Sequence, residues 1–271
     1  MIFADKLKAS ATNTNSLVCV GLDSDAAKLP TGVEQLAFNK AVVDATHDLV
    51  CAYKPNTAFY EALGAEGIQT LKDTCDYIRG VAPDVLIILD AKRADIGNTN
   101  NGYVQFAYDY LGADAITLHP YLGREALEPF LLREDKGSII LCRTSNPGAG
   151  EFQDRPVDGH KLYEHVAKMV AMDWNTGGNC MLVVGATYPE EAAAIRQIVG
   201  DGLWFLVPGV GAQGGSVEAT MVAAQNSRGD GLIISSSRDI IFASSGADFA
   251  QAARAKAEAL RSEINTYRKG Q

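Results

Sequence analysis

Short runs of apolar residues recur along the whole chain, and longer segments of mixed polar and apolar residues separate them. Strands that are buried on both faces of a parallel sheet typically show such uninterrupted apolar runs. The runs predict strands at 17–22, 49–53, 85–89, 115–118, 138–142, 181–184, 203–207 and 232–234. Helical periodicity predicts helices that include 67–81, 99–111, 159–173, 189–199, 214–226 and 246–268. Strand and helix therefore alternate from one end to the other.

Individual residues support these boundaries. Pro189, followed by Glu190 and Glu191, suits the first turn of a helix, where a missing N–H costs nothing and acids meet the positive end of the dipole. Gly200 suits the end of the same helix. The alternation continues without a break in composition, so we predict an α/β fold: a single (β/α)₈ TIM barrel over residues 1–271, with its active site at the C-terminal ends of the strands. Strands divided between two sheets are the alternative.

Composition and charge limit the kinds of partner that this protein can bind. The chain has 271 residues, 47% hydrophobic and 21% charged, which is typical of a folded globular protein. Its net charge of −9 and the lack of any Lys/Arg block argue against nucleic acid and anionic membranes as partners. A small anionic ligand is still compatible, because its site needs only a few local cations and N–H groups.

Cysteine usage and the N-terminus indicate a compartment. The five cysteines are odd in number, widely spread and contain no C-x-x-C pair, so we expect reduced, buried thiols. The first eight residues carry charges where a signal peptide needs an apolar stretch, and no apolar run is long enough for a membrane span. We therefore expect a cytoplasmic protein.

The third predicted strand ends in a group of charged residues, Asp90, Lys92 and Asp95. Asp90 and Lys92 are two positions apart, so in extended backbone they share a face. A surface salt-bridge cluster is the ordinary interpretation of such a group. At the mouth of a barrel, however, these side chains would point toward a ligand cavity. There a lysine between two carboxylates should stay an ammonium ion.

Polar residues also follow other predicted strands. Asp23 comes after the first strand, Lys54 and Asn56 after the second, and Ser145 and Asn146 after the fifth. Taken singly, Lys54 could be an exposed lysine and Asp23 a turn residue. Together they indicate charged and polar groups that converge at one end of the barrel.

The last two strands lead into segments suited to phosphate. A glycine-rich segment, 208–215, follows the seventh strand, and Ser237 and Arg238 follow the eighth. Loops after strands seven and eight are the recurring phosphate site of this architecture. Glycines let backbone N–H groups approach an anion, and arginine adds forked donors. Glycines also serve ordinary turns, so Arg238 carries most of this prediction.

Cofactor and metal motifs are missing from the sequence. There is no H-E-x-x-H pattern, no P-loop lysine and no strand-borne G-x-G-x-x-G with a partner acid. The four histidines do not have the spacing of metal ligands; His119, after the fourth strand, could touch substrate but is more simply a structural histidine. We therefore expect neither a cofactor nor a bound metal. The polar stretch 146–160 has no role that the sequence reveals, and we interpret it as a surface excursion.

The segment Asp90-x-Lys92-x-x-Asp95-Ile96-x-x-Thr99 resembles the signature of orotidine 5′-monophosphate decarboxylases. Four further segments follow in the order that this family uses: 52–56, 144–148, 207–213 and 237–238. The resemblance covers nearly the whole chain and is closest to the longer-chain branch, in which Arg93 and Gly97 replace Phe and Pro. One departure is Ser237, where many relatives have Gly.

The resemblance implies an activity and a site. It implies decarboxylation of orotidine 5′-monophosphate to uridine 5′-monophosphate, the last step of de novo UMP synthesis, in a homodimer without a cofactor. Lys92 would donate the proton within a catalytic group of Lys92, Asp90, Asp95 and Lys54, and Asp95 and Thr99 would reach the partner's site. Implied substrate contacts are Asp23, Asn56, Ile96, Thr99, Ser145, Pro208, Gln213, Ser237 and Arg238.

Two rival functions stay open at this point. A related Asp-x-Lys-x-x-Asp barrel uses Mg²⁺ on a sugar phosphate, with the acids as metal ligands, but Thr99, Ser145 and Gln213 fit the nucleotide family better. A catalytically silent barrel that only binds a phosphorylated metabolite is the second. Retention of Asp90, Lys92 and Asp95 together argues against it.

Overall fold

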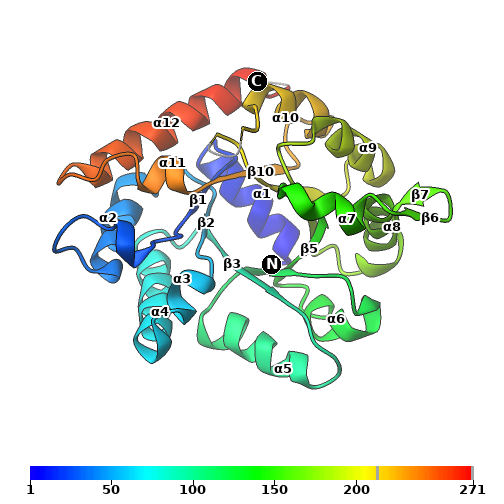
Figure 1. Cartoon of the computed structure of the whole chain (residues 1–271), viewed down its shortest axis with the longest axis horizontal. Helices are drawn as coiled ribbons and strands as arrows, with labels where there is room; N and C mark the ends of the chain where they lie inside the picture. The colour runs from blue at the N-terminus through cyan, green and yellow to red at the C-terminus, as the bar shows by residue number, and fades with distance from the viewer. Residues whose placement is uncertain (212–213, 270–271) are drawn as a thin grey trace.

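The predicted barrel is confirmed by the computed structural model, which describes residues 1–211 and 214–269. Within these residues, parallel strands pair in the order β1-β10-β9-β8-β5-β4-β3-β2 and close into a barrel (Figure 1). The barrel strands are β1 (Val18–Gly21), β2 (Ala52–Lys54), β3 (Leu86–Arg93), β4 (Ala115–Leu118), β5 (Gly137–Arg143), β8 (Cys180–Val184), β9 (Trp204–Pro208) and β10 (Leu232–Ser236).

Helices surround the barrel and connect its strands. They are α2 (Gln35–Thr46), α4 (Gly64–Val81), α5 (Thr99–Val104), α6 (Gly123–Leu131), α8 (Leu162–Met169), α9 (Pro189–Val199), α10 (Val217–Ala224) and α12 (Phe249–Tyr267). Their buried positions recur at helical spacing, as Leu71, Cys75 and Ile78 do on α4. Each helix therefore packs one face on the strands and leaves the other in solvent.

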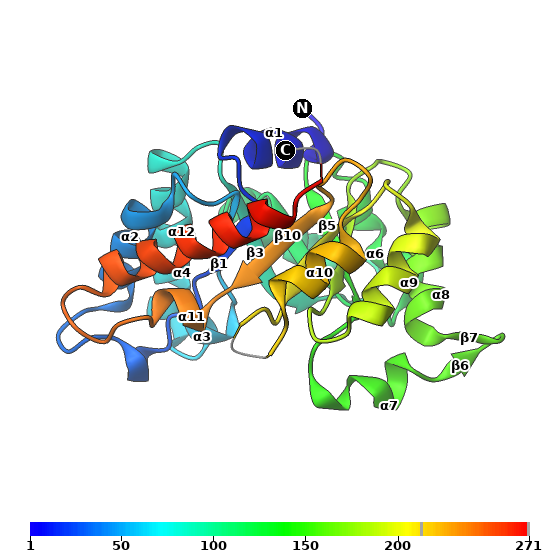
Figure 2. The ribbon, with the colours of Figure 1, turned by 90° about the horizontal axis from the view of Figure 1, so that it is seen from above.

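Shorter elements decorate the two ends of the barrel. At the end where the strands finish lie α3 (Ala58–Glu61), α7 (Gly150–Gln153), α11 (Arg238–Ile241), the 3₁₀ turns η1 (Ala26–Lys28) and η3 (Pro147–Ala149), and the hairpin of β6 (Pro156–Val157) with β7 (His160–Lys161). At the opposite end α1 (Phe3–Asn13) lies across the barrel, as Figure 2 shows. Phe3 and Leu7 of α1 are buried against it.

Several predicted boundaries were wrong by a few residues. The helix expected at 214–226 begins at Val217, where Ser216 caps it by accepting from the Ala219 N–H. The helix expected at 159–173 begins at Leu162 and ends in a π-helical turn, η4 (Val170–Trp174), because 160–161 pair in the hairpin. The helix expected at 99–111 also changes to π-helical geometry, in η2 (Gln105–Tyr110). Hydrophobic periodicity marks which face is buried, but pairing and capping decide where an element ends.

The strands are apolar because both of their faces are covered. Every residue of β1, β4, β8 and β10 is buried, whether it points into the barrel or toward the helices.

The boundaries of α9 are as predicted. The helix begins at Pro189, carries Glu190 and Glu191 in its first turn and is followed by its C-cap, Gly200, with φ +58°. These local signals could be recognised without tertiary information because each acts through its own backbone.

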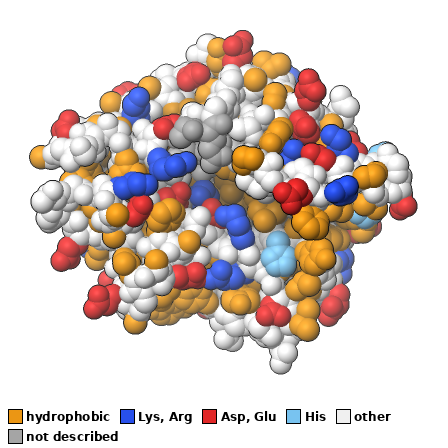
Figure 3. Space-filling view, in the orientation of Figure 1, with side chains coloured by type: hydrophobic (Ala, Val, Ile, Leu, Met, Phe, Trp, Pro, Cys, Tyr) orange, Lys and Arg blue, Asp and Glu red, His pale blue; other side chains and the backbone are white. Residues whose placement is uncertain are grey.

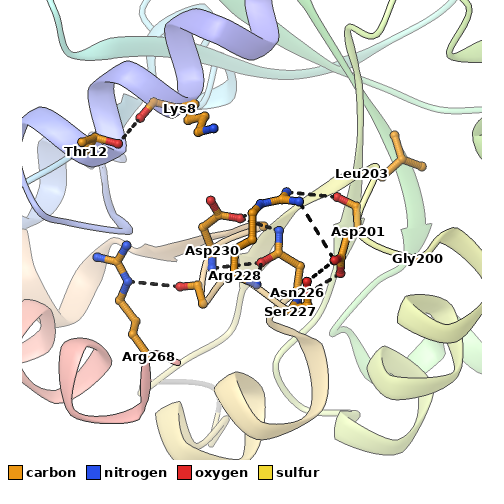
Figure 4. Close-up of polar contacts among 12 residues, drawn as sticks. Lys8, Thr12, Gly200, Asp201, Leu203, Asn226, Ser227, Arg228, Asp230 and Arg268 are labelled. Carbon is orange, nitrogen blue, oxygen red and sulfur yellow. Dashed lines mark hydrogen bonds and ion pairs between the residues drawn. The ribbon is translucent and has the colours of Figure 1, made fainter. Parts of the chain in front are cut away.

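The N-terminal end of the barrel is held by polar contacts between loops. Buried Arg196 donates to the carbonyl oxygens of Gly200, Leu203, Ala224 and Gly231, and so joins the connections on both sides of β9. Figure 4 shows the adjacent network, in which the carboxylate of Asp201 accepts from the Ser227 N–H and Asn226 Oδ1 accepts from the Arg228 N–H.

This end of the barrel contributes stability, whereas the other end holds the function of such folds. None of the helices within residues 1–211 and 214–269 combines the length and the apolar character that a membrane-spanning segment needs.

Candidate active site

A cavity of about 630 Å³ opens at the C-terminal ends of the strands. Figure 3 looks into this mouth, where Lys and Arg side chains gather around the hollow. Cavities of this size take a ligand as large as a nucleotide. The predicted site residues that line it are Asp23, Lys54, Asn56, Asp90, Lys92, Ser145, Pro208, Ser237 and Arg238.

Asp90 lies at the centre of a charged network in this cavity. Its Oδ2 accepts from Lys54 Nζ at 3.0 Å and from Asn56 Nδ2 at 3.3 Å, and its Oδ1 accepts from Lys92 Nζ at 2.6 Å. Lys54 is buried, with its side chain 6% exposed, whereas the side chain of Lys92 is half exposed. The carboxylate therefore bridges one buried ammonium group and one that faces the open cavity.

The network stays ionised although it is buried. Burial alone would raise the pKa of Asp90, but the ammonium groups of Lys54 and Lys92 outweigh it and hold this pKa below its ordinary value. Burial alone would lower the pKa of Lys54, but Asp90 and Asp23 outweigh it and raise this pKa. Both groups are thus charged at neutral pH.

Lys92 does not sit in extended backbone, as its spacing from Asp90 had suggested. Its φ is +48°, a left-handed conformation that is uncommon outside glycine. The Lys92 N–H donates to Thr117 Oγ1 at 2.9 Å, and the Thr117 hydroxyl donates to Asp90 Oδ1 at 3.0 Å. Thr117 on β4 therefore fixes both the bent backbone of Lys92 and the carboxylate to which its ammonium group is bound.

Asp23 presents an unsatisfied oxygen at the same cavity. Its Oδ1 is buried and has no hydrogen-bond partner among the described residues. A buried carboxylate oxygen without a donor is costly, so a ligand hydroxyl or N–H would be favoured there.

The ends of β9 and β10, which lead into the segments predicted to bind phosphate, are adjacent at the mouth. Arg238 lines the cavity, and its guanidinium group makes no hydrogen bond or ion pair with another residue that the structure describes. Gly209 also lines it, with φ +98°, a conformation that glycine adopts at no steric cost. Gln213 lies outside the described residues.

The neighbouring part of the mouth is built by the ends of β8, which pairs with β9, and of β5. Ser145 packs so closely on Gly185 that a Cβ on Gly185 would lie 2.8 Å from the Ser145 nitrogen. Thr144, Asn146 and Gln153 line the cavity beside it. Gln153 belongs to the excursion 146–160, for which the sequence had indicated no role.

Three predicted site residues lie apart from this cavity. Asp95 and Ile96 sit on the loop between β3 and α5, Thr99 is the first residue of α5, and none of them lines the cavity. Ile96 is 62% exposed. The Asp95 Oδ1 accepts from the Ile96 N–H, and the Asp95 backbone is held by Asn100.

Thr117 and Gln153 are among the cavity residues that the sequence analysis missed. Thr117 left a weak signal, because it is a polar residue inside an otherwise apolar strand. Gln153 left none, since its partner Thr144 comes from a different element. Among the residues described, no group of three or more His, Cys, Asp or Glu side chains could hold a metal ion.

Comparison with known proteins gives a consistent result. The family model for the orotidine 5′-phosphate decarboxylase / HUMPS family matches residues 16–255. The chain is 52% identical over 275 aligned positions to orotidine 5′-phosphate decarboxylase of Cellvibrio japonicus, which covers 99% of this chain and 100% of that one. Its relative from Azoarcus sp. is 49% identical and covers the same shares.

Solved structures show the same likeness. Leishmania donovani OMP decarboxylase superimposes with a TM-score of 0.86 at 39% identity, over 98% of this chain and 99% of that one. Leishmania donovani UMP synthase superimposes with a TM-score of 0.89, also at 39% identity, over 100% of this chain and 57% of that longer one.

Proposed function

This chain belongs to the orotidine 5′-phosphate decarboxylase / HUMPS family and converts orotidine 5′-monophosphate to uridine 5′-monophosphate and CO₂, and we propose that Lys92 supplies the proton that replaces CO₂. The observation that carries the proposal is the bridge from buried Lys54 through Asp90 to the half-exposed Lys92, at 3.0 and 2.6 Å. It presents one ammonium group, held by a fixed carboxylate, to the cavity.

The reaction needs a cation at the reacting carbon. When the bond between carbon 6 and the carboxylate breaks, the electron pair stays on carbon 6 in the plane of the ring, where the π-system cannot absorb it. The Lys92 ammonium stabilises this charge and then donates a proton to carbon 6, leaving a neutral amine that regains a proton from solvent. Preorganised charge of this kind is commonly the largest catalytic contribution in a site that excludes water.

Asp90, Lys54 and Thr117 position Lys92. The carboxylate of Asp90 holds the Lys92 ammonium group in place, and Lys54 helps to keep the pKa of that carboxylate below its ordinary value. Thr117 holds the Lys92 backbone in its left-handed conformation. Strained backbone is often retained at functional sites because the surrounding contacts determine it.

The rest of the cavity orients the nucleotide. Arg238 and Ser237 bind the phosphate beside Pro208, because a guanidinium group without a partner among the described residues is the natural partner of a dianion. The family resemblance assigns Gln213, which lies outside the described residues, to the same phosphate. Asp23, whose Oδ1 lacks a donor, accepts from the ribose, with Asn56 next to it. Ser145 binds the pyrimidine, at the end of β5.

A homodimer completes the site in this proposal. Asp95 and Ile96, on the loop after β3, and Thr99, at the start of α5, lie outside their own cavity, so a partner subunit's cavity is the place where they can act. Asp95 would then add a carboxylate to the charged network of the other subunit.

The direct test follows the loss of orotidine 5′-monophosphate absorbance with purified protein in excess EDTA. We expect rapid conversion that is nearly abolished in Lys92→Ala and unchanged in Lys256→Ala, a surface control on α12. Wild-type turnover in Lys92→Ala would disprove the role of Lys92. Turnover that requires Mg²⁺, or appears only with a sugar phosphate, would support the metal-dependent rival, whereas ligand binding without turnover would support a sensor.

A further inference from the structure

The excursion between β5 and α8 is tied back to the strand end from which it departs. The carboxamide of Gln153 on α7 makes two hydrogen bonds to Thr144, whose N–H donates to Gln153 Oε1 at 2.9 Å. Gln153 Nε2 donates to Thr144 Oγ1, also at 2.9 Å. The Thr144 hydroxyl in turn donates to Asn146 Oδ1 at 2.6 Å. Gln153 thus holds Thr144 directly and Asn146 through the Thr144 hydroxyl, and these are the two residues that flank Ser145.

Ser145 is held from its other side as well. The close approach of Gly185 limits its backbone, and Thr187 Oγ1 donates to the Ser145 carbonyl oxygen at 3.5 Å. The turn at 144–146 is therefore clamped between the β8 end and Gln153. Because Gln153 also lines the cavity, this clamp forms part of the cavity wall.

A buried arginine, Arg143, also contacts Gln153. Arg143, only 2% exposed at the end of β5, donates to Gln153 Oε1 at 3.4 Å and pairs with Asp154 Oδ2 at the same distance. Its guanidinium group lies 3.9 Å from the ring centre of Tyr188, on the connection after β8. Arg143 thereby joins α7 to two strand ends, and burial of a charge in this way needs such partners.

We propose that Gln153 is a positioning residue for recognition of the pyrimidine ring, which holds Ser145 and Asn146 at the base side of the cavity. This inference rests on the proposed function, in which Ser145 binds the base. The excursion is then a part of the substrate site, and Gln153 acts on the base while leaving the phosphate contacts at Arg238 untouched.

The test separates the base from the rest of the nucleotide. Binding of uridine 5′-monophosphate and of ribose 5-phosphate, which lacks the base, is measured by calorimetry for wild type, Gln153→Ala and the control Phe152→Ala. Phe152 is on the same helix but 69% exposed. We expect Gln153→Ala to bind uridine 5′-monophosphate about tenfold more weakly than the wild type and to keep its affinity for ribose 5-phosphate. Phe152→Ala should bind both ligands as the wild type does.

A second variant guards against a general loss of structure. Gln153→Glu keeps an acceptor for the Thr144 N–H and loses the donor to Thr144 Oγ1, so we expect an affinity for uridine 5′-monophosphate between those of wild type and Gln153→Ala. If Gln153→Ala lost affinity equally for both ligands, or for neither, this inference would be overturned while the proposed function would stand. Wild-type protein that fails to bind uridine 5′-monophosphate would overturn the proposed function, and this inference with it.

Discussion

The hydroxyl of Ser237 lies in the space that a Cβ on Gly21 would occupy. The two residues belong to adjacent strand ends, because β1 pairs with β10 through Val20 and Ser236. Ser237 is therefore accommodated by the missing side chain of Gly21. The fit keeps Ser237 beside Arg238 at the phosphate side of the cavity.

This complementarity predicts a compensating pair of substitutions. Gly21→Ala should lower the free energy of unfolding by about 1–3 kcal/mol, because the added methyl overlaps Ser237 in a packed site. Ser237→Gly in the same chain should restore most of that loss. Urea unfolding of both single variants and the double variant measures the coupling. Additive effects would show that the two side chains do not compete for the same space.

Thr117 should act on catalysis through Lys92. Thr117→Val keeps the shape but removes both hydrogen bonds, so we expect kcat to fall about tenfold or more through misplacement of the ammonium group. Thr117→Ser keeps the hydroxyl and should retain most of the activity. Affinity for uridine 5′-monophosphate should be the same in all three proteins. A Val variant with wild-type kcat would remove Thr117 from the positioning of Lys92.

Arg238 should contribute to catalytic efficiency although it is placed at the phosphate. Arg238→Ala is expected to lower kcat/KM about 100-fold, because a charged hydrogen-bonded contact to the dianion is lost. Arg238→Lys should recover only part of it, since an ammonium group cannot reproduce the forked donors. Steady-state kinetics measure both. Unchanged kcat/KM in the alanine variant would contradict the phosphate assignment.

The charge of Asp90 should make stability depend on acidic pH. Burial alone would raise the pKa of Asp90, but Lys54 and Lys92 hold it below the ordinary value of about 3.9 that it has in the unfolded chain. Its stabilising contribution is therefore fully present above about pH 4 and is lost as the pH falls through the lower folded-state pKa.

This linkage can be measured in Asp90→Asn. Below about pH 4 the free energy of unfolding of the wild type should decrease with falling pH more steeply than that of the variant. The difference between the two slopes should correspond to the uptake of up to about one proton on unfolding. Urea unfolding at a series of pH values gives both slopes. Parallel curves would mean that Asp90 has the same pKa in the folded and unfolded chains.

Much of the architecture could be predicted from the sequence because its cause is local. The strands of a closed parallel barrel are covered on both faces, so they appear as continuous apolar runs, and Pro189 and Gly200 mark a helix through their own backbone geometry. The side chains at the strand ends could likewise be placed at one mouth, because parallel strands all finish at the same end.

What the sequence by itself determined is thus the alternation of buried strands with helices, and those polar groups that follow a strand directly and meet at the mouth. Only the tertiary structure decided how those groups are held: the left-handed backbone of Lys92 depends on Thr117 of β4, and the placement of Ser145 involves Gln153 of α7. Such contacts join segments that are brought together only when the barrel closes. Local periodicity carries no record of them, because each partner would look ordinary in its own segment.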